Sequence, residues 1–179
     1  MPKYIAFLRA INVGGHVVKM EQLRQLFEAM GFAKVETFIA SGNVIFESKS
    51  KEAKTLPRQI ESYLHKALGY EVAALVRTLD ELAHVAAYRP FPESDLNAKG
   101  NTLWVGFIAD KPGKSVAQKV EALATDVDDL KVQGREVYWL FHTAFSDSKI
   151  SGSLLERTLG MKITFRNMNT VQRLLKKYS

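Results

Sequence analysis

Two adjacent glycines, Gly14 and Gly15, follow the first predicted strand and precede the first predicted helix. Arg9 lies before the pair and Lys19 after it. Backbone N–H groups in such a loop, together with a helix N-terminus, can bind a phosphate or a carboxylate. Because glycine is also the usual residue where a turn needs a positive φ, a plain turn is the alternative. The loop is therefore a candidate anion site.

Polar side chains are expected to meet at one edge of the first predicted sheet. Arg9 and Asn12 lie at the end of the first strand, and Ser41 and Asn43 lie at the turn between the second and third strands. In a split strand–helix–strand arrangement these two ends share a sheet edge. Convergent polar groups beside a loop are typical of a binding site. The alternative is that the asparagines only cap turns.

A second group of polar residues stands where the last predicted strand meets the last predicted helix. It consists of Arg166, Asn167, Asn169 and Thr170. Asn169 or Thr170 is a natural helix N-cap. A cap accounts for one of these residues but not for all four, and polar loop residues on a rigid scaffold often bind ligands. We therefore count all four as candidate ligand-binding residues.

The excess positive charge is confined to the C-terminus. The formal net charge is +6, yet residues 1–156 carry 19 basic and 19 acidic side chains, and the last 23 residues carry no acid. Helical spacing of the final apolar residues points Arg173, Lys176 and Lys177 towards solvent. We expect these three to form a patch that binds polyanions. The alternative is that they only complement the dipole of a helix end. Arg166 either joins this patch or turns inward to hold the 167–170 loop.

Several chemistries are excluded. The chain has no cysteine, so it can form neither a disulfide nor a thiolate metal site. The GKS at 113–115 lacks the earlier glycine of a P-loop, because that position is Ile108. The four histidines show no metal-ligand spacing, and Asp126, Asp128 and Asp129 are more typical of a solvated turn than of a cation site. We predict no metal and no cofactor, and leave open whether the chain is an enzyme.

The order of apolar patterns predicts two similar halves. Each half reads strand, helix, two strands, helix, strand, helix. The predicted elements of the first half are strands Lys3–Asn12, Val35–Ala40, Asn43–Phe46 and Glu71–Arg77 with helices Met20–Met30, Glu52–Leu68 and Leu79–Ala87. Those of the second are strands Thr102–Ala109, Leu130–Gln133, Glu136–His142 and Lys162–Arg166 with helices Ser115–Ala124, Ile150–Leu159 and Thr170–Tyr178. The prediction is an α+β protein of two ferredoxin-like βαββαβ halves packed together, over residues 1–88 and 101–179, with a linker at 89–100.

Three sequence blocks resemble those of domain-of-unknown-function family 1697. They are RAINVGGHVVKM at 9–20, FIASGNVIFES at 38–48 and TFRNMNTVQRLL at 164–175, and the resemblance extends over nearly the whole chain. One departure is Met168, where the family often carries tryptophan. The resemblance implies two ferredoxin-like halves in a bacterial cytoplasmic protein, and it implies no reaction.

The sequence therefore predicts a cytoplasmic binding module for an anionic ligand, with nucleic acid as the leading candidate. No apolar run is long enough to span a membrane, so no membrane partner is expected. The alternative is a small-molecule enzyme or sensor that acts on a phosphate- or carboxylate-bearing metabolite.

Overall fold

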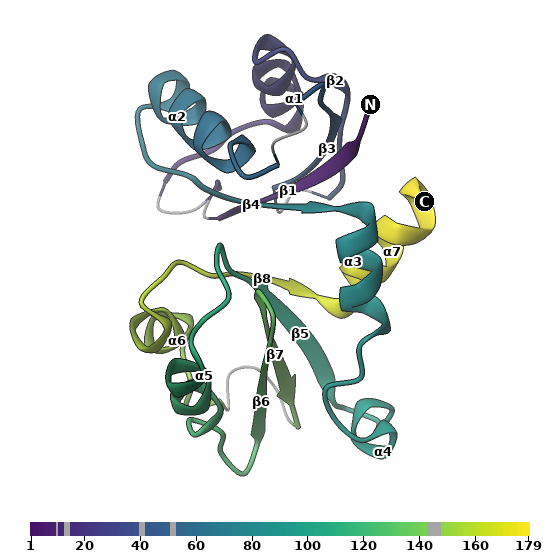
Figure 1. Ribbon diagram of the computed structural model, residues 1–179, viewed down its shortest axis with the longest axis vertical. Helices are drawn as coiled ribbons and strands as arrows, with labels where there is room; N and C mark the ends of the chain where they lie inside the picture. The colour runs from purple at the N-terminus through teal and green to yellow at the C-terminus, as the bar shows by residue number, and fades with distance from the viewer. Residues whose placement is uncertain (10, 13–14, 40–41, 51–52, 143–147) are drawn as a thin grey trace. The chain divides into compact units, whose positions relative to one another are not determined.

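The computed structural model describes residues 1–9, 11–12, 15–39, 42–50, 53–142 and 148–179 (Figure 1). It contains two four-stranded sheets with helices interleaved along the chain. The chain divides into two compact units, one of Met1–Leu82 with Tyr178–Ser179 and one of Ala83–Lys177. Among the described residues, no helix is long and apolar enough to cross a membrane.

The first unit is built on one sheet with strand order β2-β3-β1-β4. Its elements are β1 (Lys3–Arg9), α1 (Met20–Ala29), β2 (Ala33–Thr37), β3 (Asn43–Glu47), α2 (Leu56–Leu68) and β4 (Ala73–Thr78). All neighbouring strands pair antiparallel, so β1 and β2 run parallel to each other with β3 inserted between them. This is the split βαβ arrangement, and it confirms the predicted fold class.

The second unit repeats this plan with strand order β6-β7-β5-β8. Its elements are β5 (Thr102–Phe107), α5 (Lys114–Glu121), β6 (Asp128–Gln133), β7 (Glu136–Phe141), α6 (Gly152–Leu159) and β8 (Thr164–Asn167), followed by α7 (Met168–Tyr178). Two helices lie between the sheets in sequence, α3 (Leu79–Ala87) and α4 (Glu93–Leu96). The stretch 89–100, expected to be a linker, contains α4 and belongs to the second unit.

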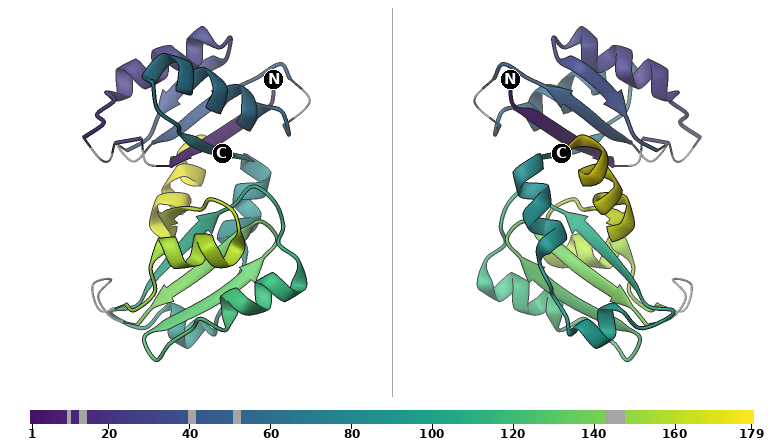
Figure 2. Two further views of the ribbon diagram at one scale, coloured as in Figure 1. Left: turned by 90° about the vertical axis from the view of Figure 1, so that its left-hand side faces the viewer. Right: turned by 90° about the vertical axis from the view of Figure 1, so that its right-hand side faces the viewer.

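Each sheet carries its main apolar core on the face covered by two helices, α1 and α2 in the first unit and α5 and α6 in the second (Figure 2). In the first core Phe27 of α1 packs against Phe46 of β3, with ring centroids 5.6 Å apart. In the second, Trp139 and Phe141 of β7 have ring centroids 4.5 Å apart. β1 is buried along both alternating sets of side chains, as its apolar pattern predicts.

Gly42, at the turn between β2 and β3, is required by both conformation and space. Its φ is +82°, and a Cβ there would lie 2.9 Å from Ile11 Cγ2 and 3.2 Å from Leu8 Cβ. Gly31, which follows α1, has a φ of +90° but open space around it. Both glycines have a left-handed backbone, but only Gly42 lacks space for a side chain. Comparing them therefore distinguishes the cost of backbone strain from the cost of steric overlap.

We predict that Gly42→Ala lowers the free energy of unfolding by more than twice as much as Gly31→Ala. A left-handed conformation costs an L-residue about 1–2 kcal/mol, and only the change at Gly42 adds steric overlap. Urea unfolding of the two variants measures the difference. Equal losses of stability would contradict this account of Gly42.

Candidate functional site

The structure brings the two predicted loops of the first unit to one sheet edge. Phe7 of β1 pairs with Asn43 of β3, and Leu8 N donates to Gly42 O over 2.9 Å. The end of β1 and the β2–β3 turn are thus neighbours. Gly14 and Ser41, both candidate site residues, lie outside the described residues.

Hydrogen bonds at this edge hold the loops themselves. Asn12 Oδ1 accepts from Val18 N over 2.7 Å, and Asn43 Nδ2 donates to Phe38 O over 2.8 Å. Asn43 is fully buried. Both amides therefore act as the turn caps considered from the sequence.

The other two described candidates at this edge are Gly15 and Arg9. Gly15 has a φ of +84°, which favours the plain-turn interpretation of the glycine pair. Arg9 is half-buried.

Tyr70 is a further anchor of the same edge that the sequence did not indicate. Its hydroxyl donates to Ile11 O over 3.0 Å, and its ring stacks on His16 with centroids 3.8 Å apart. Burial raises the pKa of the Tyr70 hydroxyl above its ordinary value. The hydroxyl thus stays protonated and keeps donating to the loop.

In the second unit β8 continues directly into α7. The strand ends at Asn167 and the helix begins at Met168. Asn167 Oδ1 accepts from Asn169 N over 2.9 Å, so Asn167 satisfies a free N–H of the first turn. The predicted cap at Asn169 or Thr170 was wrong, because the helix starts two residues earlier than its apolar spacing suggests.

Arg166 is buried, with 7% of its surface exposed. Its Nη1 donates to Thr164 Oγ1 and to Phe165 O, each over 2.9 Å. Burial lowers the pKa of the guanidinium to about 10. Arg166 thus takes the inward orientation, in which it holds the end of β8 instead of joining the exposed cations.

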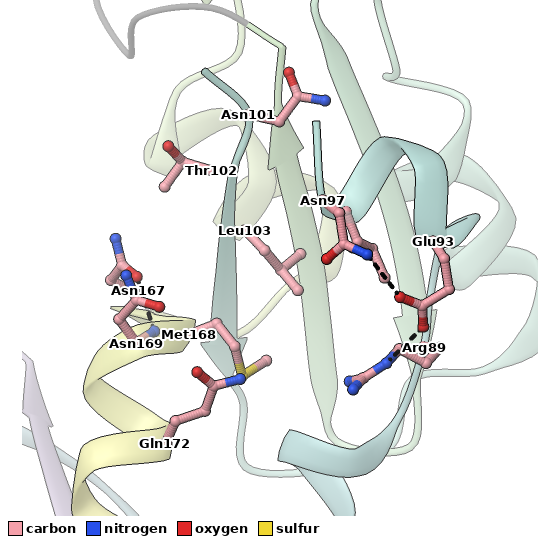
Figure 3. Close-up of a pocket in the computed structure, with 11 residues that line it drawn as sticks. Arg89, Glu93, Asn97, Asn101, Thr102, Leu103, Asn167, Met168, Asn169 and Gln172 are labelled. Carbon is pink, nitrogen blue, oxygen red and sulfur yellow. Dashed lines mark hydrogen bonds and ion pairs between the residues drawn. The ribbon is translucent and has the colours of Figure 1, made fainter. Parts of the chain in front are cut away.

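A cavity of about 390 Å³ lies beside the start of α7 (Figure 3). We call it the amide pocket, because five carboxamide side chains line it. The lining residues are Arg89, Glu93, Leu96, Asn97, Asn101, Thr102, Leu103, Asn167, Met168, Asn169 and Gln172. Two predicted site residues, Asn167 and Asn169, are among them, whereas Thr170 is not.

The amide pocket is electrically balanced. Of its described lining residues only Arg89 and Glu93 are charged, and Arg89 Nε donates to Glu93 Oε1 over 2.9 Å. Glu93 also accepts from Asn97 Nδ2 over 3.2 Å. The pocket wall thus presents neutral amides beside a paired carboxylate, and these residues offer no net charge to an anion.

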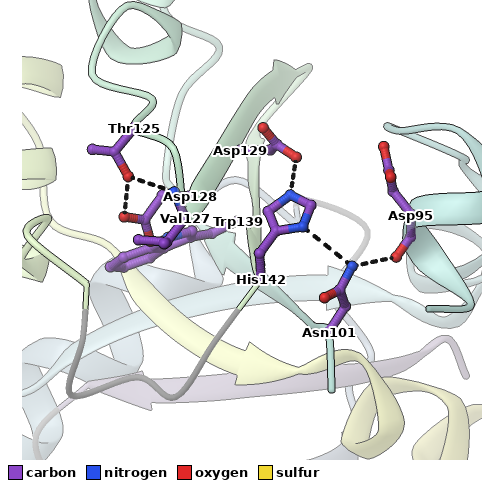
Figure 4. A network of polar contacts seen from close by, with 8 residues as sticks. All are labelled: Asp95, Asn101, Thr125, Val127, Asp128, Asp129, Trp139 and His142. Atoms are coloured by element: carbon purple, nitrogen blue, oxygen red, sulfur yellow. Dashed lines mark hydrogen bonds and ion pairs between the residues drawn. The ribbon is translucent and has the colours of Figure 1, made fainter. Parts of the chain in front are cut away.

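A chain of polar contacts orients Asn101 at the pocket (Figure 4). Asn101 Nδ2 donates to Asp95 O over 2.8 Å and lies 3.3 Å from His142 Nδ1, while His142 Nε2 lies 2.5 Å from Asp129 Oδ2. Because an amide N–H approaches Nδ1, the proton of a neutral His142 belongs on Nε2, where it faces the carboxylate. The carbonyl of Asp95, which can only accept, fixes the orientation of the Asn101 amide, and His142 lies beside the same amide nitrogen.

Asp128 is the centre of a separate, buried hydrogen-bond network next to these polar contacts. It is fully buried and accepts from Trp139 Nε1 over 2.9 Å, from Thr125 Oγ1 over 2.7 Å and from Ser148 Oγ over 2.8 Å. The expectation of a solvated turn was wrong for Asp128, since three donors compensate its burial. Among the described residues, no group of three or more His, Asp or Glu side chains could hold a metal ion.

The predicted basic residues lie on the exposed side of α7. The helix buries Met168, Val171 and Leu174. Asn169, Gln172, Arg173 and Lys176, at positions i, i+3, i+4 and i+7, are all exposed. We call these four residues the outer stripe of α7. Lys177 is exposed next to it.

Sequence reasoning missed the other wall of the amide pocket. Arg89, Glu93, Asn97 and Asn101 fall in and around the stretch expected to be a linker. Their polar composition was visible, but it is the same composition that predicts a loop. Only the pairing of β5 with β8, which joins Trp104 to Asn167, brings this segment to α7.

We predict that Asp128→Ala lowers the free energy of unfolding by about 3 kcal/mol. The change leaves one buried indole N–H and two hydroxyls without their acceptor. The control is Asp126→Ala at an exposed position two residues away, which should cost less than about 0.5 kcal/mol. Urea unfolding followed by tryptophan fluorescence measures both losses of stability. A mild effect at Asp128 would contradict the stabilising role of its hydrogen bonds.

We also predict that Thr164→Val destabilises the second unit by about 1.5–3 kcal/mol, because the buried Arg166 loses a hydroxyl acceptor. Thr164→Ser keeps the hydroxyl and should cost clearly less. Chemical unfolding compares the two variants. If serine and valine are equally harmful, the bond to Arg166 is not what Thr164 contributes.

Comparison with known proteins supports the fold and the family. The structure of the conserved bacterial protein SP0830 from Streptococcus pneumoniae aligns with 99% of this chain and 98% of that chain, at a TM-score of 0.76 and 21% identity. At that identity the similarity shows the fold alone. No curated protein is significantly similar to this sequence.

The family model described as "Protein of unknown function (DUF1697)" matches residues 1–138. The match ends within β7 and so does not include β8 and α7. It extends over most of the chain and agrees with the resemblance carried by the first two sequence blocks. The chain therefore belongs to the DUF1697 family of proteins of unknown function.

Proposed function

We propose that this protein is a binding module for an anionic ligand, with single-stranded nucleic acid as the ligand that fits best. One observation carries the proposal. The outer stripe of α7 leads from Asn169 and Gln172, which line the amide pocket, to the cations Arg173 and Lys176. Neutral hydrogen-bonding groups and cations thus follow one another along one helix face.

The charge of this region favours phosphates as partners. The last 23 residues carry no acidic side chain, and they include Arg173, Lys176 and Lys177. Exposed lysines and arginines attract phosphate backbones and release the counterions condensed on them. Asparagine and glutamine amides also contact sugars and phosphates.

The sheet edge of the first unit supports a ligand less well. Asn12 and Asn43 each bond to the backbone of their own loops, and Asn43 is buried. These contacts favour structural roles for both residues. The alternative of a small-molecule enzyme or sensor at this edge therefore has less support than binding along α7.

We predict that replacing Arg173, Lys176 and Lys177 together by glutamine weakens binding of single-stranded RNA and flattens its salt dependence. Each phosphate contact on a single strand contributes about 0.7 to the log–log slope of affinity against salt, so losing three should reduce the slope by about 2. Fluorescence anisotropy with a labelled 12-nucleotide RNA, measured over a range of salt concentrations, gives both quantities.

The matched control replaces Lys111, Lys114 and Lys119 by glutamine, since these are three exposed lysines elsewhere in the same unit. This variant has the same net charge as the test variant. Binding should weaken far less in the control. Equal weakening would show attraction by net charge only. Undetectable binding by the wild type at low salt would overturn the proposal. The three cations would then only complement the dipole of the helix end.

A further inference from the structure

We infer that the amide pocket binds an uncharged nucleobase, while the cations of α7 contact the phosphates joined to it. The inference rests on the proposed function and extends it, because it assigns the neutral part of the ligand to a defined cavity. The shared chemistry is a base attached to a phosphate, whether in a free nucleotide or in a single strand.

The charge balance of the pocket disfavours the phosphate itself as its occupant. Arg89 and Glu93 neutralise each other over 2.9 Å, and the other described lining residues are neutral. A phosphate placed there would lose its hydration and meet a carboxylate, at a large cost in free energy. An uncharged polar group meets no such penalty.

The pocket combines an apolar centre with amide walls. Leu103 and Met168 lie between Asn97 on one side and Asn169 and Gln172 on the other (Figure 3). The thioether of Met168 is a favourable neighbour for an aromatic ring. A flat apolar face with polar edges is the shape that such a site accommodates, and a nucleobase has that shape.

The walls offer both donors and acceptors of hydrogen bonds. The Asn101 Nδ2 group faces Asp95 O and His142 Nδ1, which leaves Oδ1 of that amide as an acceptor. The Asn167 Oδ1 atom is engaged by Asn169 N, which leaves Nδ2 as a donor. Within the described residues, the side-chain amide of Gln172 has no hydrogen-bond partner.

Base edges are read by this kind of paired donor and acceptor, and asparagine and glutamine pair with the adenine edge through two bonds. The volume of about 390 Å³ lies within the range of small-molecule sites. From Asn169 at the pocket to Lys176 is seven residues of helix, or about 10 Å. A base in the pocket therefore leaves its phosphates within reach of the cations.

The test compares strands that have the same charge but differ in their bases. Labelled 12-nucleotide oligo(A) and an abasic sugar–phosphate 12-mer are titrated by fluorescence anisotropy at one salt concentration. The wild type should bind oligo(A) about tenfold more tightly than the abasic strand, as expected for one well-formed base contact. Adenosine 5′-monophosphate, titrated by calorimetry, tests whether a free nucleotide suffices.

Two pocket variants and one control test whether the base binds in the amide pocket. Gln172→Met and Asn97→Leu remove amides with little change in volume, at exposed positions. Each should reduce the preference for oligo(A) over the abasic strand to less than about threefold, since one paired contact accounts for about tenfold. Gln118→Met, at an exposed position on α5, should leave the preference intact.

The outcomes separate the two proposals. Equal affinity of the wild type for both strands, without binding of the nucleotide, overturns the base pocket and leaves the polyanion module standing. A preference that survives both pocket variants also overturns it. Nucleotide binding that Gln172→Met abolishes supports the pocket even if neither strand binds, and identifies a free nucleotide as the ligand. If neither strand nor nucleotide binds, both proposals fail.

Discussion

The junction at which β8 becomes α7 determines where the candidate ligand-binding groups of the second unit lie. No residue separates the strand from the helix, so the direction of α7 is set by the last strand residue. Two interactions hold this junction: Arg166 is anchored to Thr164 and Phe165, and Asn167 caps the first turn. With this start fixed, helical periodicity buries Val171 and Leu174 and places the outer stripe of α7 in solvent.

The first unit has the same kind of strand-to-helix junction, but other side chains cap its helix. There β4 runs directly into α3, and Arg77 is buried at the position that Arg166 occupies in the second unit. Thr78 Oγ1 accepts from Glu81 N over 3.0 Å and Glu81 Oε2 accepts from Thr78 N over 2.9 Å, which is a reciprocal capping box. These side-chain groups are engaged in the cap. In the second unit Asn167 caps with its oxygen alone, so its amide nitrogen remains for the pocket.

A neutral pocket next to exposed cations suits the desolvation costs of a ligand that consists of a base and a phosphate. The base loses its water most cheaply where amides replace the lost hydrogen bonds. In the binding mode that we propose, the phosphate keeps much of its hydration because Arg173 and Lys176 are exposed at the surface. Asp95 contributes indirectly, because its backbone carbonyl accepts from Asn101 Nδ2 and so leaves Oδ1 of that amide to meet a ligand.

The amino-acid sequence by itself determined the order of elements apart from the short helix α4, the two ferredoxin-like halves and the family. Apolar periodicity is a local property, which is why α3 was predicted with its observed bounds and α7 to within two residues of its start. The concentration of basic residues near the C-terminus could also be predicted, because the position of a charge along the chain does not depend on tertiary contacts. The N-cap of α7 and the environment of Asp128 were predicted incorrectly, since polar residues at element ends have several local uses. Only the tertiary structure decided that Asn97, Asn101 and Asn167 line one cavity, because their meeting depends on β5 pairing with β8 across some 60 residues of chain.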